Sequence, residues 1–106
     1  MGGIAQALPE LLIDVKNYLY ITWDDSETDK KVSELIQSGI VYLQSKIGDV
    51  SFTDPGLPRS LLLDYVRYMR DGAMDIFEAN YMHIILAAKH DAEVKQYAET
   101  ADATEQ

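Results

Sequence analysis

Four acidic side chains, Asp24, Asp25, Glu27 and Asp29, fall within six positions and form the densest chemically active group in the chain. Such a group can hold a divalent cation, supply acid–base catalysis or mark the start of a helix. A calcium-binding loop starting at Asp24 or at Asp25 lacks the glycine and the glutamate that such a loop requires. The pattern therefore favours a helix start over a metal site.

The residues around this group match the N-terminus of a helix. Ser26, followed three residues later by Asp29, approximates a capping box, and Asp25 is the competing cap. The acidic side chains then lie in the first turn, where the helix dipole favours negative charge. We predict Asp25, Ser26 and Asp29 as helix-cap residues and expect no metal ligand among them.

No other set of residues has the spacing of a catalytic site. His83 and His90 are seven positions apart, too far for the i, i+4 pairing of metal ligands on a helix. The chain has no cysteine, no glycine-rich phosphate loop and no serine in a nucleophile elbow. We therefore predict no catalytic residue, no cofactor and no enzymatic activity. A hydrolase whose acidic residues meet His83 only in the fold stays open as an alternative.

The composition is that of a small acidic domain. Its 106 residues suit one domain, and 18 acidic against 9 basic residues give a net charge of −9, which opposes tight binding to nucleic acid. The N-terminus lacks the basic start of a secretory signal, and no apolar stretch approaches the ~20 residues of a membrane span. The seven tyrosines exceed what a small core can hold, and tyrosine is enriched at protein interfaces.

Apolar residues at helical spacing predict the helices that position these side chains. A first helix is expected over residues 9–20, with Pro9 in its first turn, and a second over residues 26–47, with Gly48 as its stop. Gly39 inside the second helix costs ~1 kcal/mol relative to alanine. It is either tolerated at that cost or marks a close helix–helix crossing.

A loop over residues 49–58 leads into the third and most regular helix. Phe52 either pins this loop to the core or contacts a partner. Apolar residues over 62–77 follow the i, i+3, i+4, i+7 pattern, with Gly72 inside the helix and open to the same two interpretations as the earlier glycine. Asn80 is expected to end this helix.

We predict an all-α fold, a small bundle of three main helices plus a C-terminal helical segment, in a single domain over residues 1–106. Residues 1–7 are expected to be a flexible N-terminus, 8–80 the helical core, 81–97 a C-terminal docking segment and 98–106 a flexible tail. The start of the docking segment is also compatible with a strand. The predicted core residues are Leu35, Ile36, Leu43, Tyr65, Met69 and Phe77.

Two stretches of the sequence resemble a known family. The stretch "LLIDVKNYLYITWDDSETDKKVSELIQSGIVYLQSKIG" resembles the N-terminal half of the head–tail connector (adaptor) proteins of long-tailed bacteriophages and prophages. In that family a short helix ends in a "YL.I" element, and an acidic turn and a long helix follow. The stretch "LLLDYVRYMRDGAMDIFEANY" resembles the next helix in the branch found in prophages of low-GC Gram-positive bacteria. The resemblance covers residues 8–97, and its motifs are structural rather than catalytic.

The resemblance implies a structural virion protein. Connectors of this family form a ring beneath the portal, extend the DNA channel and offer the attachment surface for the next head-completion or tail component. For this chain it implies a homo-oligomeric ring of about twelve-fold symmetry, through which DNA passes without specific binding. It also implies no membrane partner, and a location at the head–tail interface of the virion after assembly in the bacterial cytoplasm.

The resemblance further implies that the C-terminal segment contacts the portal protein. The side chains that the sequence offers for this contact are Tyr81, Ile84, Ile85, Ala88 and Tyr97. The alternative function is a small helical protein-binding or regulatory module that acts as a dimer.

Overall fold

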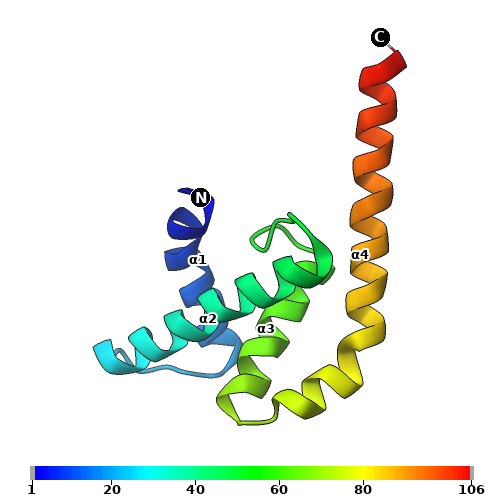
Figure 1. Ribbon diagram of the computed structural model, residues 1–106. Coiled ribbons are helices and arrows are strands. Elements are labelled where there is room, and N and C mark those ends of the chain that lie inside the picture. The colour runs from blue at the N-terminus through cyan, green and yellow to red at the C-terminus, as the bar shows by residue number, and fades with distance from the viewer. Residues whose placement is uncertain (1, 106) are drawn as a thin grey trace.

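The computed structural model describes the backbone of residues 2–105 and the side chains of residues 8–98. Four helices follow one another in this part of the chain: α1 (Gly2–Tyr18), α2 (Ser26–Ile47), α3 (Leu57–Arg70) and α4 (Met74–Glu105) (Figure 1). No strand occurs in the described residues, so the all-α prediction is confirmed. None of the helices, over the same residues, combines the length and the hydropathy needed to cross a membrane.

Helix α2 lies at the centre of the bundle and packs against the other three helices. A Cβ atom at Gly39 of α2 would come within 2.7 Å of the side chains of Leu62 and Tyr65 in α3. Glycine is therefore required for the two helices to approach this closely, and the close-crossing interpretation of Gly39 is confirmed. The buried face of α2 consists of Val32, Ile36, Gly39, Ile40, Leu43 and Ile47.

The predicted core is largely correct. Leu35 and Met69 lie only partly buried at its edge. The central rings come from three helices, since Tyr65 of α3 contacts Phe77 of α4 edge to face at 5.7 Å between centroids and Tyr42 of α2 at 5.4 Å. The other four predicted core residues are at most 2% exposed: Ile36, Leu43, Tyr65 and Phe77.

Helix α1 differs from its prediction at both ends. It begins at Gly2, so Pro9 lies inside the helix rather than in its first turn, and residues 2–7, predicted as a flexible N-terminus, are helical. A proline at this position removes one hydrogen bond of the ladder, and its ring crowds the carbonyl of the residue four positions earlier. At the other end Tyr20 has a left-handed φ of 61°, and its backbone N–H donates to the Asn17 carbonyl at 3.2 Å. The Ile21 N–H donates to the Lys16 carbonyl at 2.8 Å, which completes a Schellman motif.

The predicted continuous helix over residues 62–77 is wrong. Helix α3 stops at Arg70 and Gly72 adopts a φ of 70°. The Gly72 N–H donates to the Met69 carbonyl at 3.1 Å, and the Ala73 N–H donates to the Tyr68 carbonyl at 2.8 Å, a second Schellman motif. Gly72 is thus a helix stop and not a packing glycine. The predicted stop at Asn80 lies inside α4 instead.

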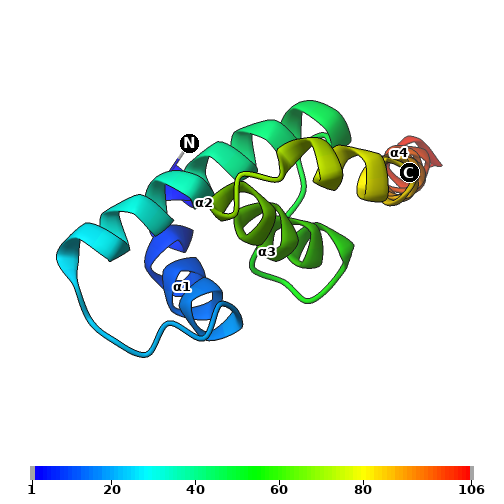
Figure 2. The same ribbon diagram turned by 90° about the horizontal axis from the view of Figure 1, so that it is seen from below.

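Helix α4 contains 32 residues, and only part of it packs on the bundle. It changes direction within its first, yellow part and then runs away from the other helices (Figure 1). Viewed along its second part, α4 stands beside the bundle rather than over it (Figure 2). The predicted tail over residues 98–106 is helical as far as Glu105, and residue 106 lies outside the described residues.

The loop before α3 is packed against the core. Phe52 is 6% exposed and belongs to the core, so the interpretation that it pins the loop is confirmed. Pro58 stands in the first turn of α3, where its missing N–H has no intrahelical partner to lose. The loop is thereby fixed beside α4, and the two together form one of the surfaces described below.

Candidate functional site

The acidic group at residues 24–29 is built into the junction between α1 and α2. Asp25 is the N-cap of α2, because its carboxylate accepts hydrogen bonds from the Thr28 backbone N–H at 3.2 Å and from the Thr28 hydroxyl at 2.8 Å. These bonds hold the pKa of Asp25 below its ordinary value. The Asp25 prediction is confirmed. Ser26 is not the cap, because it already lies in the first turn while Asp25 has the extended backbone of a cap.

Asp24 and Asp29 both pair with Lys16 of α1. The Lys16 Nζ lies 3.3 Å from Asp24 Oδ1 and 2.8 Å from Asp29 Oδ1, and the hydrogen bond to Asp29 raises the pKa of Lys16. Asp29 therefore ties α2 to α1 and does not belong to a capping box. Among the residues that the structure describes, no group of three or more histidine or acidic side chains is arranged to hold a metal ion.

Most of the seven tyrosines belong to the bundle. Phe77 stacks on Tyr81 with 4.8 Å between centroids, and Tyr68 meets these two rings edge-on at 5.8 Å and 5.6 Å, respectively. These contacts fasten the start of α4 to α3. Two tyrosines remain at the surface, Tyr20 and Tyr97, which are 86% and 77% exposed. The expectation that tyrosines serve an interface therefore applies to these two.

A cluster of tyrosines around one carboxylate joins α1, α3 and α4. Tyr18 donates a hydrogen bond to Asp64, which raises the pKa of Tyr18. Burial, followed by hydrogen bonds to Tyr68 and Asp64, raises the pKa of Tyr81 to about 12. The Arg67 guanidinium lies over the Tyr18 and Tyr68 rings, at 5.9 Å and 5.1 Å from their centroids. Raised tyrosine pKa values keep these hydroxyls neutral, so the cluster connects helices and does not create a nucleophile.

The side chains predicted to contact a portal lie on two sides of α4. Ile85 and Ala88 are 1% and 3% exposed, and Tyr81 and Ile84 are partly buried against the bundle. The prediction that this apolar face is free to dock is therefore wrong for these four residues. The reason is that α1, α2 and α3 alone leave one side of the core exposed, and the inner face of α4 covers it. Of the five, Tyr97 alone is exposed.

A second stripe runs along the outer side of α4. Leu86 and Val94 are 56% and 53% exposed, and they share this side with Tyr97. His83 and His90, both exposed, complete a series with spacings of three or four residues, which places all five along one side of the helix. No hydrogen bond or ion pair joins His83 to an acidic side chain among the described residues.

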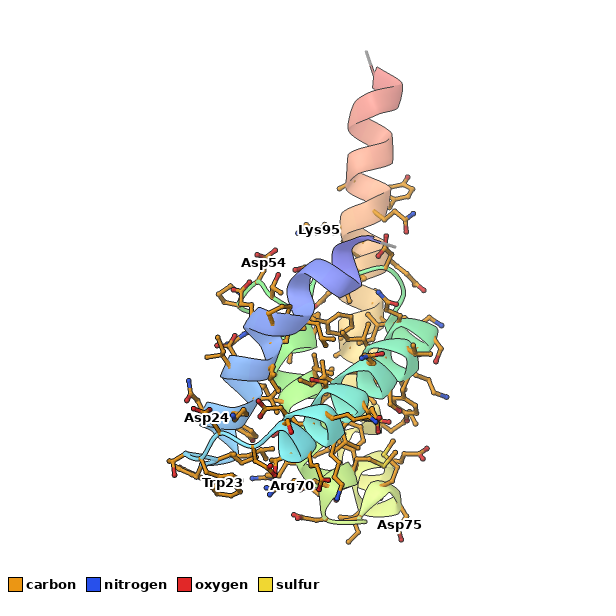
Figure 3. All side chains as sticks on the ribbon, turned by 90° about the vertical axis from the view of Figure 1, so that its left-hand side faces the viewer. Trp23, Asp24, Asp54, Arg70, Asp75 and Lys95 are labelled. Carbon is orange, nitrogen blue, oxygen red and sulfur yellow. The ribbon has the colours of Figure 1, made fainter. Side chains whose placement is uncertain are left out.

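A cluster at the ends of α1 and α3 has the composition of a protein-binding surface. We call Tyr20, Trp23, Arg67 and Arg70 the aromatic–arginine corner. Trp23 is 49% exposed, and the other three line a depression of about 400 Å³. Trp23 and Arg70 lie at the same end of the molecule (Figure 3). Tryptophan, tyrosine and arginine are the residue types that most often dominate binding energy at protein interfaces.

A groove of opposite character lies between the loop over residues 48–58 and α4. Its volume is about 620 Å³, and its apolar lining includes Val50, Leu57 and Ala88. We call it the acidic groove, because four carboxylates and one lysine line it: Asp49, Asp54, Asp91 and Glu93, with Lys95. Asp54 and Lys95 lie at the end of the bundle from which α4 projects, away from Trp23 and Arg70 (Figure 3).

Neither the aromatic–arginine corner nor the acidic groove is among the sites predicted from the sequence. The groove joins a loop to residues some forty positions further along the chain, and only the fold brings them together. For the corner a signal existed, since Trp23 is the single tryptophan of the chain and lies three residues after Tyr20. Comparison of the chain with protein-family models, with curated proteins and with solved structures finds no match. The function is therefore inferred from these surfaces and from the motifs of the sequence.

Proposed function

We propose that this chain is a structural assembly protein, a bacteriophage or prophage head–tail connector that forms a ring under the portal. In this role it extends the DNA channel, passes DNA without binding it and offers the surface to which the next head-completion or tail component attaches. It carries no catalytic or cofactor chemistry, and it works in the virion after assembly in the host cytoplasm. The sequence resemblance over residues 8–97 is the basis of the proposal.

The observation that carries the proposal furthest is the projecting half of α4. Residues 93–98 are all exposed, and α4 runs away from the bundle over this length (Figure 1). An isolated helix of this kind gains little stability from its own propensity, and most helical stability in proteins comes from packing. A projecting helix that carries exposed Val94 and Tyr97 is suited to packing against a partner.

The proposed portal contact is the outer side of α4 around Leu86, Val94 and Tyr97, and not the inner face that the sequence suggested. The inner side chains are occupied within the chain itself, whereas these three are more than half exposed. Tyrosine is enriched at protein interfaces because it combines a large apolar area with a polar end. The net charge of −9 supports a channel wall that does not bind DNA.

Truncation at residue 81 is unsuitable as a test of this contact. It would remove Ile85 and Ala88 from the core and would unfold the bundle. A better test uses the double variant Val94→Glu/Tyr97→Glu, which changes only exposed side chains. The full chain is expected to co-sediment with portal-bearing capsids of the same phage, and the double variant is expected to lose most of this binding.

The matched control is the variant Ile13→Glu, on α1, which is 62% exposed and far from the projecting half of α4. It should bind portal-bearing capsids as well as the unchanged chain. Equal binding by the double variant would show that α4 is not the docking element. If the unchanged chain fails to bind, the connector function is wrong.

The second candidate is the helical protein-binding module that acts as a dimer. The outer stripe of α4 favours it, because its exposed residues follow one another at spacings of three or four and so line one side of the helix, which a second helix could cover: His83, Leu86, His90, Val94 and Tyr97. A symmetric dimer that is unaffected by portal, measured by sedimentation velocity, would favour this candidate over the connector.

A further inference from the structure

We propose that copies of this chain associate head to tail, with the aromatic–arginine corner of one copy seated in the acidic groove of the next. The proposal deepens the connector function and rests on it for the existence of a ring. A ring requires two different contact surfaces on each copy, and the proposal assigns these roles to the corner and the groove.

The corner supplies exposed cations in an acidic chain. Of the basic residues, Lys16 and Arg59 are used in ion pairs inside the bundle, Arg59 with Asp14 at 2.8 Å. Arg70 forms no ion pair among the described residues and stands between two depressions. One is the corner depression, and the other, of about 570 Å³, is lined by Lys31, Leu35 and Met69 among others. Arg70 is therefore free to meet a carboxylate from outside the chain.

The groove supplies the complementary charge. Its four carboxylates, from Asp49, Asp54, Asp91 and Glu93, face one lysine, and none of the four forms an ion pair within the described part of the chain. The groove is open to solvent, has a volume of about 620 Å³, and all four carboxylates are exposed. It can therefore accept an aromatic ring together with a guanidinium group.

The apolar lining of the groove matches the aromatic part of the corner. Leu57 is 40% exposed at the groove, and Trp23 is 49% exposed at the corner. Covering both removes apolar surface from water, which is the main driving force for association. The arginines then fix the orientation, because opposite charges across an interface raise specificity and association rate more than affinity.

The positions of the two surfaces determine the type of assembly. The labelled residues of the corner, Trp23 and Arg70, and those of the groove, Asp54 and Lys95, lie at opposite ends of the helical bundle (Figure 3). A contact between different surfaces is heterologous, so each copy leaves one corner and one groove free, and repetition produces a closed ring or an open filament. A symmetric dimer, in contrast, would place like surfaces against each other and would oppose their like charges.

The absence of cysteine in the sequence allows a direct test by cross-linking. Asp71→Cys places a thiol at the edge of the corner depression, and Glu93→Cys places one in the groove. The two single variants are mixed at low ionic strength and treated with a short bis-maleimide. We expect a 71–93 cross-linked dimer to form about tenfold faster than either the 71–71 or the 93–93 product, because only corner and groove attract.

Charge reversal provides the control within the same assay. Arg70→Glu in the Asp71→Cys chain should abolish the 71–93 product, and Asp91→Lys in the Glu93→Cys chain should restore it. A chain with Val41→Cys, on an exposed part of α2, is mixed with the Glu93→Cys chain to measure the background rate of cross-linking, and these two chains are the background pair. Circular dichroism confirms that each variant is folded.

The outcomes separate this contact from the connector function. A 71–93 product no faster than the background pair, or a product unaffected by Arg70→Glu, overturns the head-to-tail contact even if the chain binds portal. A fast, charge-dependent 71–93 product supports the contact even if portal binding fails, in which case only the connector function is lost. A dominant 71–71 or 93–93 product contradicts the contact in favour of a symmetric dimer.

Discussion

Neighbouring residues at the start of α4, Ile76 and Phe77, are expected to differ sharply in their contribution to stability. Phe77 is 0% exposed, whereas Ile76 is 50% exposed. In a continuous helix over residues 62–77 both would belong to the apolar stripe that faces the core. In the observed fold the turn at Gly72 reorients the chain, so that only Phe77 enters the core. Alanine substitution at the two positions therefore tests the path of the chain as well as its packing.

The magnitude follows from the contacts of the Phe77 ring. It meets four tyrosine rings, those of Tyr42, Tyr65, Tyr68 and Tyr81, at centroid distances of 4.8–6.5 Å. Removal of a buried phenylalanine costs ~3–5 kcal/mol, and helices on all sides oppose collapse of the cavity. Since a domain is stable by ~5–15 kcal/mol, Phe77→Ala should lose a large part of the total. Ile76→Ala should change stability by about 0.5 kcal/mol or less.

The assay is urea unfolding followed by far-UV circular dichroism, with the free energy of unfolding taken from the linear extrapolation. Phe77→Leu serves as a control, because it keeps most of the apolar volume and should cost less than Phe77→Ala. Equal losses for Ile76→Ala and Phe77→Ala would refute the turn at Gly72 as the reason for the difference. A near-neutral Phe77→Ala would mean that α4 does not pack on the bundle in solution.

Three further predictions concern single positions. Tyr20→Gly should increase the free energy of unfolding by up to ~1 kcal/mol and raise the melting temperature, because glycine adopts the left-handed φ of 61° without the steric cost of a side chain. An unchanged or lower melting temperature would contradict this. Because the folded pKa of Tyr81 is about 12 against an ordinary 10.0, the unfolded state loses its proton first, and stability should fall as pH rises from 10 to about 12. Tyr81→Phe should flatten this fall in alkaline urea titrations. Asp25→Ala should lower the melting temperature while Asp25→Asn largely retains it, and calcium should leave the unchanged chain unaffected; a calcium-dependent rise would restore the metal interpretation.

The boundaries of α2 could be predicted because both signals are local. Asp25 accepts from an N–H three residues later, and Gly48 adopts a φ of 112°, so each depends only on nearby backbone. The pairing of Asp29 with Lys16 could not be predicted in the same way. It depends on how α1 turns back along α2, which in turn depends on the left-handed conformation of Tyr20, a residue type that rarely adopts it.

The division between α3 and α4 shows why a regular apolar pattern can mislead. Phe77 returns to the core after the turn at Gly72, so the spacing of buried residues continues as though the helix were unbroken. The stop was nevertheless present in the sequence, since arginines in the last turn followed by glycine are a common C-terminal signal. The inner face of α4 was misassigned for a related reason, because burial of Ile85 and Ala88 depends on the direction that α4 takes after this turn.

Cryo-electron microscopy of the chain mixed with portal rings of the same phage is the decisive test of the proposed assembly under a phage portal. We expect an added ring of density on one face of the portal, with α4 of each bound copy directed toward the portal. The Val94→Glu/Tyr97→Glu variant should leave most portal rings without this density. Portal rings that look the same with and without an excess of the unchanged chain would contradict the claim.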